Sequence, residues 1–123
     1  MTIHLDTSAL IVAIAEKGAG LDRLESWLAT SERVTFSALV LYEWLRQARE
    51  EETHQLEQLF KHQVLVPFGP AEARIAADLY KVVARPRTRE VDIAIAACAI
   101  VHNAALWTLN PRDFADIPGL RLV

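Results

Sequence analysis

Cysteine, long apolar runs and net positive charge are all scarce in this sequence, and each scarcity excludes a class of protein. The single cysteine, Cys98, leaves no internal disulfide framework and favours a reducing compartment. The charged Asp6 interrupts the first apolar run, so no secretory signal peptide is predicted. The longest later apolar stretch, Ile93 to Val101, is too short to span a bilayer. We therefore expect a soluble cytoplasmic protein with no membrane partner.

The charge balance has no basic excess. Lysine and arginine number 13 against 16 acidic residues, which gives a net charge of −3 at pH 7. Any nucleic-acid binding must therefore use a local basic patch instead of bulk attraction. The four histidines show no zinc-type spacing, and with one cysteine a zinc site is not expected.

The length and the order of elements indicate a single α/β domain over residues 1–123. Short strands are predicted at residues 2–5, 34–36, 64–66, 106–109 and 120–123. Helices are predicted at residues 8–16, 21–28, 38–48, 56–60, 70–83 and 91–103, and residues 85–89 form a loop. Strands that alternate with helices in this way predict a parallel sheet covered by helices.

Local signals set the expected boundaries of several helices. Gly18 and Gly20 are expected to break the first helix. Ser37 is placed to cap the helix that follows the second strand. The acidic run Glu50 to Glu52 marks either a break or an exposed corner.

Acidic residues from distant parts of the sequence fall where the predicted elements meet one edge of the sheet. Asp6 follows the first strand directly, and Asp113 follows the strand at 106–109. Asp92 begins the buried helix, and Glu43 lies early in the third helix, from which its longer side chain can reach the same edge. Because ligands bind beyond the carboxyl ends of parallel strands, we expect these carboxylates to converge.

A shared site of this kind predicts a divalent cation. Clustered carboxylates repel one another, and oxygen-only ligands select hard cations such as Mg²⁺ or Mn²⁺. Such a site suits phosphodiester hydrolysis, because the metal polarises the phosphoryl oxygen and lowers the pKa of its water. Simpler roles stay open: Asp6 could cap the first helix, and Asp92 could complement a helix dipole. Glu43 lies among apolar residues, where an unpaired carboxylate needs a partner.

A basic cluster precedes Asp92. It consists of Lys81, Arg85, Arg87 and Arg89. These side chains could hold RNA phosphates beside the site, with Arg112 as a further contact, or they could simply form a solvated loop.

Four segments carry a resemblance that spans nearly the whole chain. They are Leu5–Leu10 (LDTSAL), Glu43 in its helix, Val91–Ala97 (VDIAIAA) and Thr108–Phe114 (TLNPRDF). In this order and spacing they resemble the PIN-domain family, specifically the VapC-type toxin ribonucleases of toxin–antitoxin pairs. The resemblance implies a three-layer α/β/α fold with a central parallel sheet of four to five short strands.

The resemblance also implies roles for individual residues. Asp6 and Asp92 match the principal metal ligands, and Glu43 matches the third acid, which helps to hold metal or activate water. The fourth position is open between Asn110, which can coordinate but carries no charge, and Asp113. Ser8 matches a position that often bears a hydroxyl near the metal, although a role at the start of the helix is equally compatible.

The activity implied is Mg²⁺-dependent endonucleolytic cleavage of RNA, with Mn²⁺ as a substitute. The implied partners are a cognate VapB-type antitoxin that inserts a peptide into the site and a second copy of the chain, with a higher assembly as a further form. A receiver-like phosphoacceptor domain would need an adjacent acidic pair after the first strand, and a dehalogenase-type phosphatase would need an aspartate in place of Ser8. An inactive PIN-like binding protein is the remaining alternative.

Overall fold

The computed structural model describes residues 1–30, 32–60 and 65–123. Its centre is a parallel sheet of four strands in the order β2-β1-β3-β4. The strands are β1 (Thr2–Leu5), β2 (Arg33–Phe36), β3 (Ala104–Trp107) and β4 (Arg121–Leu122). The predicted α/β fold with a short-stranded parallel sheet is confirmed.

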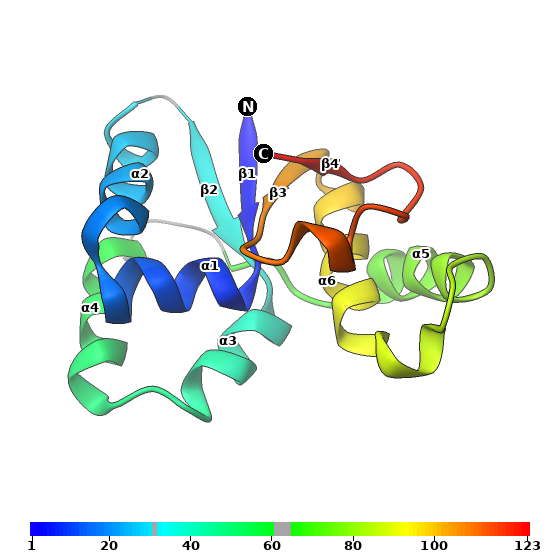
Figure 1. Cartoon of the computed structure of the whole chain (residues 1–123), viewed down its shortest axis with the longest axis horizontal. Helices are drawn as coiled ribbons and strands as arrows, with labels where there is room; N and C mark the ends of the chain where they lie inside the picture. The colour runs from blue at the N-terminus through cyan, green and yellow to red at the C-terminus, as the bar shows by residue number, and fades with distance from the viewer. Residues whose placement is uncertain (31, 61–64) are drawn as a thin grey trace.

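Helices cover both faces of the sheet (Figure 1). The helices are α1 (Thr7–Ile11), α2 (Gly18–Ala29), α3 (Ala38–Leu45), α4 (Glu50–Phe60), α5 (Pro70–Tyr80) and α6 (Glu90–Val101). Shorter helical turns are the π-helical η1 (Val12–Glu16) and the 3₁₀ turns η2 (Pro86–Thr88) and η3 (Pro111–Asp113). In Figure 1, α2 and α4 lie to one side of the strands and α5 and α6 lie to the other.

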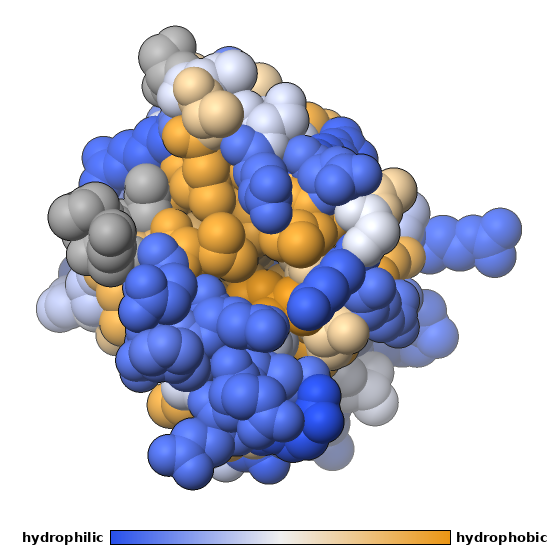
Figure 2. Space-filling model, turned by 90° about the vertical axis from the view of Figure 1, so that its left-hand side faces the viewer, coloured by the Kyte–Doolittle hydropathy of each residue, from blue (hydrophilic) through white to orange (hydrophobic). Residues whose placement is uncertain are grey.

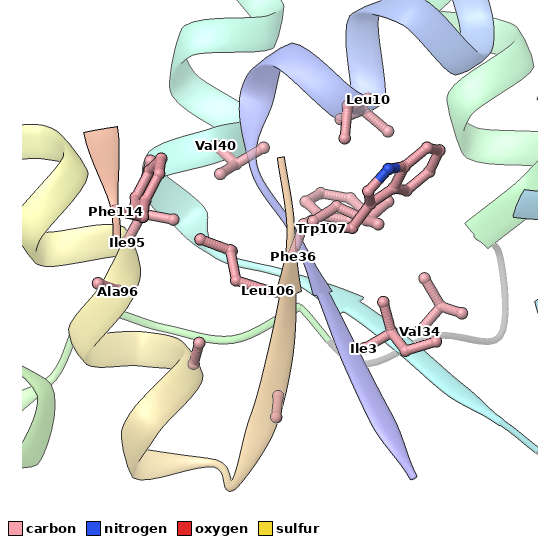
Figure 3. Close-up of a cluster of buried hydrophobic side chains, with 14 of the residues drawn as sticks. Ile3, Leu10, Val34, Phe36, Val40, Ile95, Ala96, Leu106, Trp107 and Phe114 are labelled. Atoms are coloured by element: carbon pink, nitrogen blue, oxygen red, sulfur yellow. The ribbon is translucent and has the colours of Figure 1, made fainter. Parts of the chain in front are cut away.

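Strand alternation divides the core between these two layers. Ile3 pairs in register with Val34, and Leu5 pairs with Trp107, so these side chains share the face toward α1 and α2. The Trp107 ring meets that of Trp27 of α2 edge to face, with ring centroids 5.1 Å apart. Figure 3 shows part of this apolar face, with Ile3, Val34 and Trp107, beside the residues that pack against or belong to α6, among them Ile95 and Ala96.

The opposite face of the sheet contains a buried polar pair. His4 is fully buried on β1, and its Nδ1 lies 2.9 Å from the Thr35 hydroxyl on β2. Burial lowers the pKa of His4 to about 4, and the charge of His102 acts in the same direction. His4 is therefore neutral at physiological pH and serves as part of the core.

Local signals predicted some helix boundaries and missed others. Ser37 caps α3 as predicted, since its hydroxyl accepts a hydrogen bond of 3.2 Å from the Val40 amide. A break does occur at the predicted place, where Lys17 separates η1 from α2 and both Lys17 and Gly18 have positive φ, but Gly20 lies inside the first turn of α2 and breaks nothing. The segment Glu50 to Glu52 forms the first turn of α4, where acidic side chains complement the helix dipole.

Two other boundaries were predicted too far along the chain. Strand β3 ends at Trp107, whereas the prediction extended this strand to Leu109. The Thr108 hydroxyl accepts a hydrogen bond from the Asn110 amide, and this bond turns the backbone. Helix α5 ends at Tyr80, which leaves Val82 exposed beyond it.

The strand predicted at 64–66 is reduced to a single contact in the described residues. Val66 forms an isolated parallel bridge with Ser37, and residue 64 lies outside the described residues. Across residues 1–30, 32–60 and 65–123, no helix has both the length and the apolar character to cross a bilayer.

Candidate active site

Asp6 lies at the carboxyl end of β1 and is only 5% exposed. It occupies the N-cap position of α1 but makes no side-chain capping bond. Its Oδ2 instead accepts hydrogen bonds from the Thr108 hydroxyl at 2.7 Å and the Ser8 hydroxyl at 3.1 Å. Burial raises the pKa of Asp6, while these two bonds and a backbone bond from Thr7 act against the rise. The simple capping role is therefore not what the structure shows.

Glu43 of α3 is held by a hydroxyl at the same edge of the sheet. Thr7 of α1 donates a hydrogen bond of 2.5 Å to Glu43 Oε1. The nearest guanidinium nitrogen, on Arg46, lies 3.9 Å from Oε2 and is a weak, exposed partner. The apolar neighbours Tyr42 and Leu45 are themselves exposed, and the Glu43 side chain is 24% exposed. Glu43 is therefore less buried than its sequence context suggested.

Asp92 lies in the first turn of α6, and its carboxyl is only partly buried. The pKa of Asp92 is raised to about 6, first by burial and then by the charges of Asp6, Asp113 and Glu43, while Arg89 acts against the rise. Asp92 therefore lies close enough to the other three acids for their charges to affect its ionisation.

The fourth position of the site has two candidates, Asp113 on η3 and Asn110 three residues earlier. Asp113 and Asp92 line one open cleft of about 440 Å³. The other residues that line it are Arg85, Thr88, Arg89, Arg112 and Asp116. Asn110 is exposed and is not among the residues that line this cleft.

The basic residues of the loop before α6 differ in what they contact. Arg85 and Arg112 both line the cleft, and Arg87 lines a neighbouring hollow that reaches Asp92. Arg85 adopts a left-handed backbone with φ of 51°, a conformation that stores strain in a residue with a Cβ. Arg89 also lines the cleft, but its guanidinium is bound to Asp116 and to backbone carbonyls.

Hydroxyl groups connect the acidic residues to the backbone. Ser8 donates to Asp6 and accepts from the Leu109 amide at 3.0 Å, so it links the start of α1 to the chain after β3. Thr7 and Thr108, which bind Glu43 and Asp6, were assigned no role by the sequence analysis. The sequence does place both threonines at element ends, since Thr7 directly follows Asp6 and Thr108 directly follows the last residue of β3.

The donor set agrees with a hard divalent cation. The acids offer carboxylate oxygens, and within the described residues neither Asp6 nor Asp92 forms an ion pair with a cationic side chain. The side-chain positions are not yet those of a closed metal site, since no three His, Cys, Asp or Glu side chains in the described part of the chain are grouped for one ion. Burial is the main cause of the raised pKa of Asp92, and the neighbouring carboxylate charges outweigh that of Arg89.

The fold and these acids can be compared with known proteins. The PIN domain family model matches residues 3–120. The chain belongs to the PIN domain family. Ribonuclease VapC19 of Mycobacterium tuberculosis is 32% identical over 122 residues, with 95% of each chain covered. The sequence-based assignment to the VapC-type branch of this family is thereby confirmed.

Two further similarities support the PIN-domain fold. Ribonuclease VapC1 of Rickettsia felis is 44% identical over 63 residues, a match that spans 48% of this chain and 46% of that protein. In the crystal structure of DNA-bound VapBC from Salmonella typhimurium, one chain superimposes with a TM-score of 0.83 at 23% identity. That superposition covers 100% of this chain and 97% of the other, and it establishes the shared fold.

Proposed function

We propose that this chain is the ribonuclease toxin of a VapBC-type toxin–antitoxin pair and cleaves RNA internally with the help of Mg²⁺ or Mn²⁺. The observation that carries the proposal is the set of acids Asp6, Glu43, Asp92 and Asp113, in which the pKa of Asp92 is raised to about 6 by burial first and then by the charges of the other three. The family membership and the VapC names of the relatives support the same conclusion.

Each acid has a distinct part in the proposed chemistry. Asp6 and Asp92 would hold the ion, with Glu43 as the third ligand or the group that orients water. A bound ion would polarise the phosphoryl oxygen and lower the pKa of its water. Thr108 and Ser8 fix the Asp6 carboxylate, and Thr7 fixes that of Glu43, which limits the reorganisation needed when substrate binds. Asp113 is the better candidate for the fourth position, because it shares the cleft with Asp92.

The substrate would be held by its phosphates. Arg85 and Arg112 line the same cleft as Asp92 and Asp113, and Arg87 lines a hollow that also reaches Asp92. Phosphate contacts of this kind position a strand without reading its sequence. The proposal accordingly specifies RNA as a class and leaves the cleavage sequence to be measured.

We further propose a VapB-type antitoxin as the partner, a homodimer as the assembly unit and the cytoplasm as the location. Solved structures of the same fold are described as VapBC complexes, from Rickettsia felis and Salmonella typhimurium among others. Co-expression with the product of a short neighbouring gene, followed by light scattering, tests both the partner and the dimer. A chain that stays monomeric and unbound would contradict this part of the proposal.

The central experiment is RNA cleavage by the purified chain in Mg²⁺, in Mn²⁺ and in excess EDTA. Cleavage is expected with either ion and not with EDTA. Asp6→Asn and Asp92→Asn should each reduce the rate by at least about 100-fold, because a ligand charge is lost. Asp78→Asn, an exposed acid on α5, is the matched control and should leave the rate unchanged. Persistent cleavage by the Asp6 and Asp92 variants would overturn the assignment of the site.

Metal binding has an independent readout in stability. An ion that binds only the folded chain should stabilise it by about 3 kcal/mol at 100 times its Kd. Millimolar Mn²⁺ is therefore expected to raise the melting temperature of the wild-type chain and not that of Asp92→Ala. An unchanged melting temperature in the wild type, together with RNA binding without cleavage, would favour the inactive PIN-like binding protein.

A further inference from the structure

Arg89 differs from the other basic residues of the cleft in how its charge is used. Its side chain is 11% exposed, and its guanidinium donates to acceptors on two other segments. One nitrogen donates to the Ala84 carbonyl at 2.8 Å and to Asp116 Oδ2 at 2.9 Å. The other donates to the Asp113 carbonyl at 2.8 Å and to Asp116 Oδ1 at 2.6 Å. The Asp116 contact is thus a two-pronged ion pair, the geometry that best defines relative orientation.

The segments joined in this way carry two of the acids. Arg89 immediately precedes α6, so it lies about one turn before Asp92. The Asp113 carbonyl that it binds belongs to the residue whose carboxylate lines the cleft. Among residues 1–30, 32–60 and 65–123, the other hydrogen bond of Asp113 lies within its own turn, where its amide donates to the Asn110 carbonyl at 3.0 Å. Arg89 therefore connects the acid on η3 to the acid on α6.

The charges of Arg89 and Asp116 also compensate each other. The bond to Asp116 raises the pKa of Arg89, and the same bond lowers the pKa of Asp116, so both groups stay charged over a wide pH range. By contrast, Arg85 is exposed, and in the described residues neither it nor Arg112 forms an ion pair. Those two guanidinium groups are available to a phosphate, whereas that of Arg89 is already occupied.

We propose that Arg89 and Asp116 form a clasp that positions Asp113 relative to Asp92, and that Arg89 is a positioning residue instead of a phosphate contact. The proposal rests on the nuclease activity proposed above. It assigns a role to Asp116, a residue to which the sequence analysis gave none, and it revises the role expected for Arg89.

Asp116→Asn separates the two roles of Arg89. Suppose first that Arg89 contacts phosphate. Asp116→Asn would then free its guanidinium and remove a negative charge from the cleft. RNA would bind equally well or more tightly, and turnover would not fall. If the clasp positions Asp113, Asp116→Asn should damage turnover much as Arg89→Gln does. Asp116 is 46% exposed as a side chain, so this variant is expected to fold.

The kinetic test compares Arg89→Gln, Asp116→Asn and the double variant at saturating Mg²⁺. Each single variant should lower kcat by about 10- to 100-fold, since small misplacements of reacting groups have effects of that size. KM for RNA should change by less than about threefold, and the double variant should be no worse than the poorer single one. A twofold or smaller change of kcat in Asp116→Asn, or a KM effect in Arg89→Gln with kcat intact, would overturn the clasp.

Arg121→Gln is the matched control for the loss of an arginine contact. Arg121 of β4 donates to the Asn103 carbonyl at 3.0 Å and to its side chain at 3.2 Å. This contact joins the C-terminal segment to the residue before β3, away from the acids. Arg121→Gln should leave kcat within about twofold. A loss of kcat equal to that of Arg89→Gln would show a general effect of loosening this segment and would contradict the proposal.

Amide hydrogen exchange tests the clasp without any activity. The amides of Asp113 and Phe114 donate within η3, and they should exchange at least about 10-fold faster in Asp116→Asn than in the wild type. Unchanged exchange in both clasp variants would overturn the clasp even if the enzyme is active. A wild-type chain that cleaves no RNA would instead reject the proposed function, and the exchange rates would still decide on the clasp.

Discussion

At the scale of single residues, the hydroxyl groups decide how the acids are presented. Thr108 and Ser8 both donate to Asp6, and Thr7 donates to Glu43. Asp92 is only partly buried, and the neighbouring acids Asp6, Asp113 and Glu43 add to the rise of its pKa caused by burial. The site thus combines two carboxylates held by hydroxyl groups with a third whose ionised form is disfavoured.

Asp92→Asn is predicted to stabilise the metal-free protein while abolishing cleavage. Between the ordinary value of 3.8 and its folded pKa of about 6, Asp92 is protonated in the folded chain but ionised in the unfolded one. The free energy of unfolding therefore falls as pH rises through this window, and the fall is complete at pH 7.5. After discounting for solvent screening, removal of the charge should add about 1 kcal/mol, or about 3–5 °C in melting temperature.

The measurement is thermal unfolding in EDTA at pH 7.5, with Asp78→Asn as the surface control. The advantage of Asp92→Asn should shrink as the pH falls below about 6, where wild-type Asp92 is protonated. A lower melting temperature for Asp92→Asn in EDTA would contradict the idea of unfavourable charge at this position.

At the scale of elements, caps and loops set where each acid is carried. Helix α3 begins at the Ser37 cap and presents Glu43 in its second turn. The loop after α5 contains η2 and leads directly into α6, so Arg85 and Arg87 lie close to Asp92. Element ends therefore place both the carboxylates and the basic side chains at the same edge of the sheet.

Ser37→Ala is predicted to destabilise the chain by about 1 kcal/mol, because the Val40 amide loses its acceptor. With a typical urea dependence, the unfolding midpoint should fall by about 0.5 M. Ser26→Ala, an exposed serine within α2, is the control and should be neutral or slightly stabilising. Equal midpoints for Ser37→Ala and the wild type would show that the cap is not needed.

The double variant Arg85→Gln, Arg87→Gln is predicted to bind RNA more weakly and with less dependence on salt. Two lost contacts to a single strand should reduce the slope of log K against log salt by about 1.4. Binding is measured in EDTA, so that cleavage does not interfere. Arg33→Gln, at the start of β2 and the opposite end of the strands, should leave the slope unchanged. An unaltered slope in the double variant would remove the loop from RNA binding.

At the scale of the whole molecule, the sheet order joins distant segments. Strand β1 lies between β2 and β3, so Asp6 meets Thr108 across 102 positions of the sequence. The other face of the same strand carries His4, buried against the second helical layer. The central strand therefore contributes to the site and to the core at once.

His4 is predicted to make the fold sensitive to acid. Its folded pKa of about 4 lies below the ordinary 6.5, so the unfolded chain takes up this proton first and stability falls as pH drops through that window. His4→Gln keeps a polar partner for Thr35 but cannot titrate. Between pH 7.5 and pH 5, the wild type should lose about 2 kcal/mol more unfolding free energy than this variant. Parallel losses in urea unfolding at the two pH values would contradict the prediction.

Much of the fold was determined by the sequence itself. The strand at Thr2–Leu5, the cap at Ser37 and the apolar helix α6 depend on patterns over a few neighbouring residues, and they were predicted correctly. Boundaries failed where a side chain competed with the backbone, as Thr108 does after β3. Sequence position alone also indicated Asp6 and Asp92 as candidates, since both lie where elements end.

Only the tertiary structure decided which groups meet. The hydroxyl that fixes Asp6 comes from the far end of the chain, and the partner of Arg89 is Asp116, 27 positions away. Local patterns carry no information about such pairs, because the order of parallel strands and the path of each crossover bring them together. Arg89 belongs to the same basic cluster as Arg85 and Arg87, but it alone of the three is mostly buried against a carboxylate. This burial depends on how the segments pack, which the local sequence does not show.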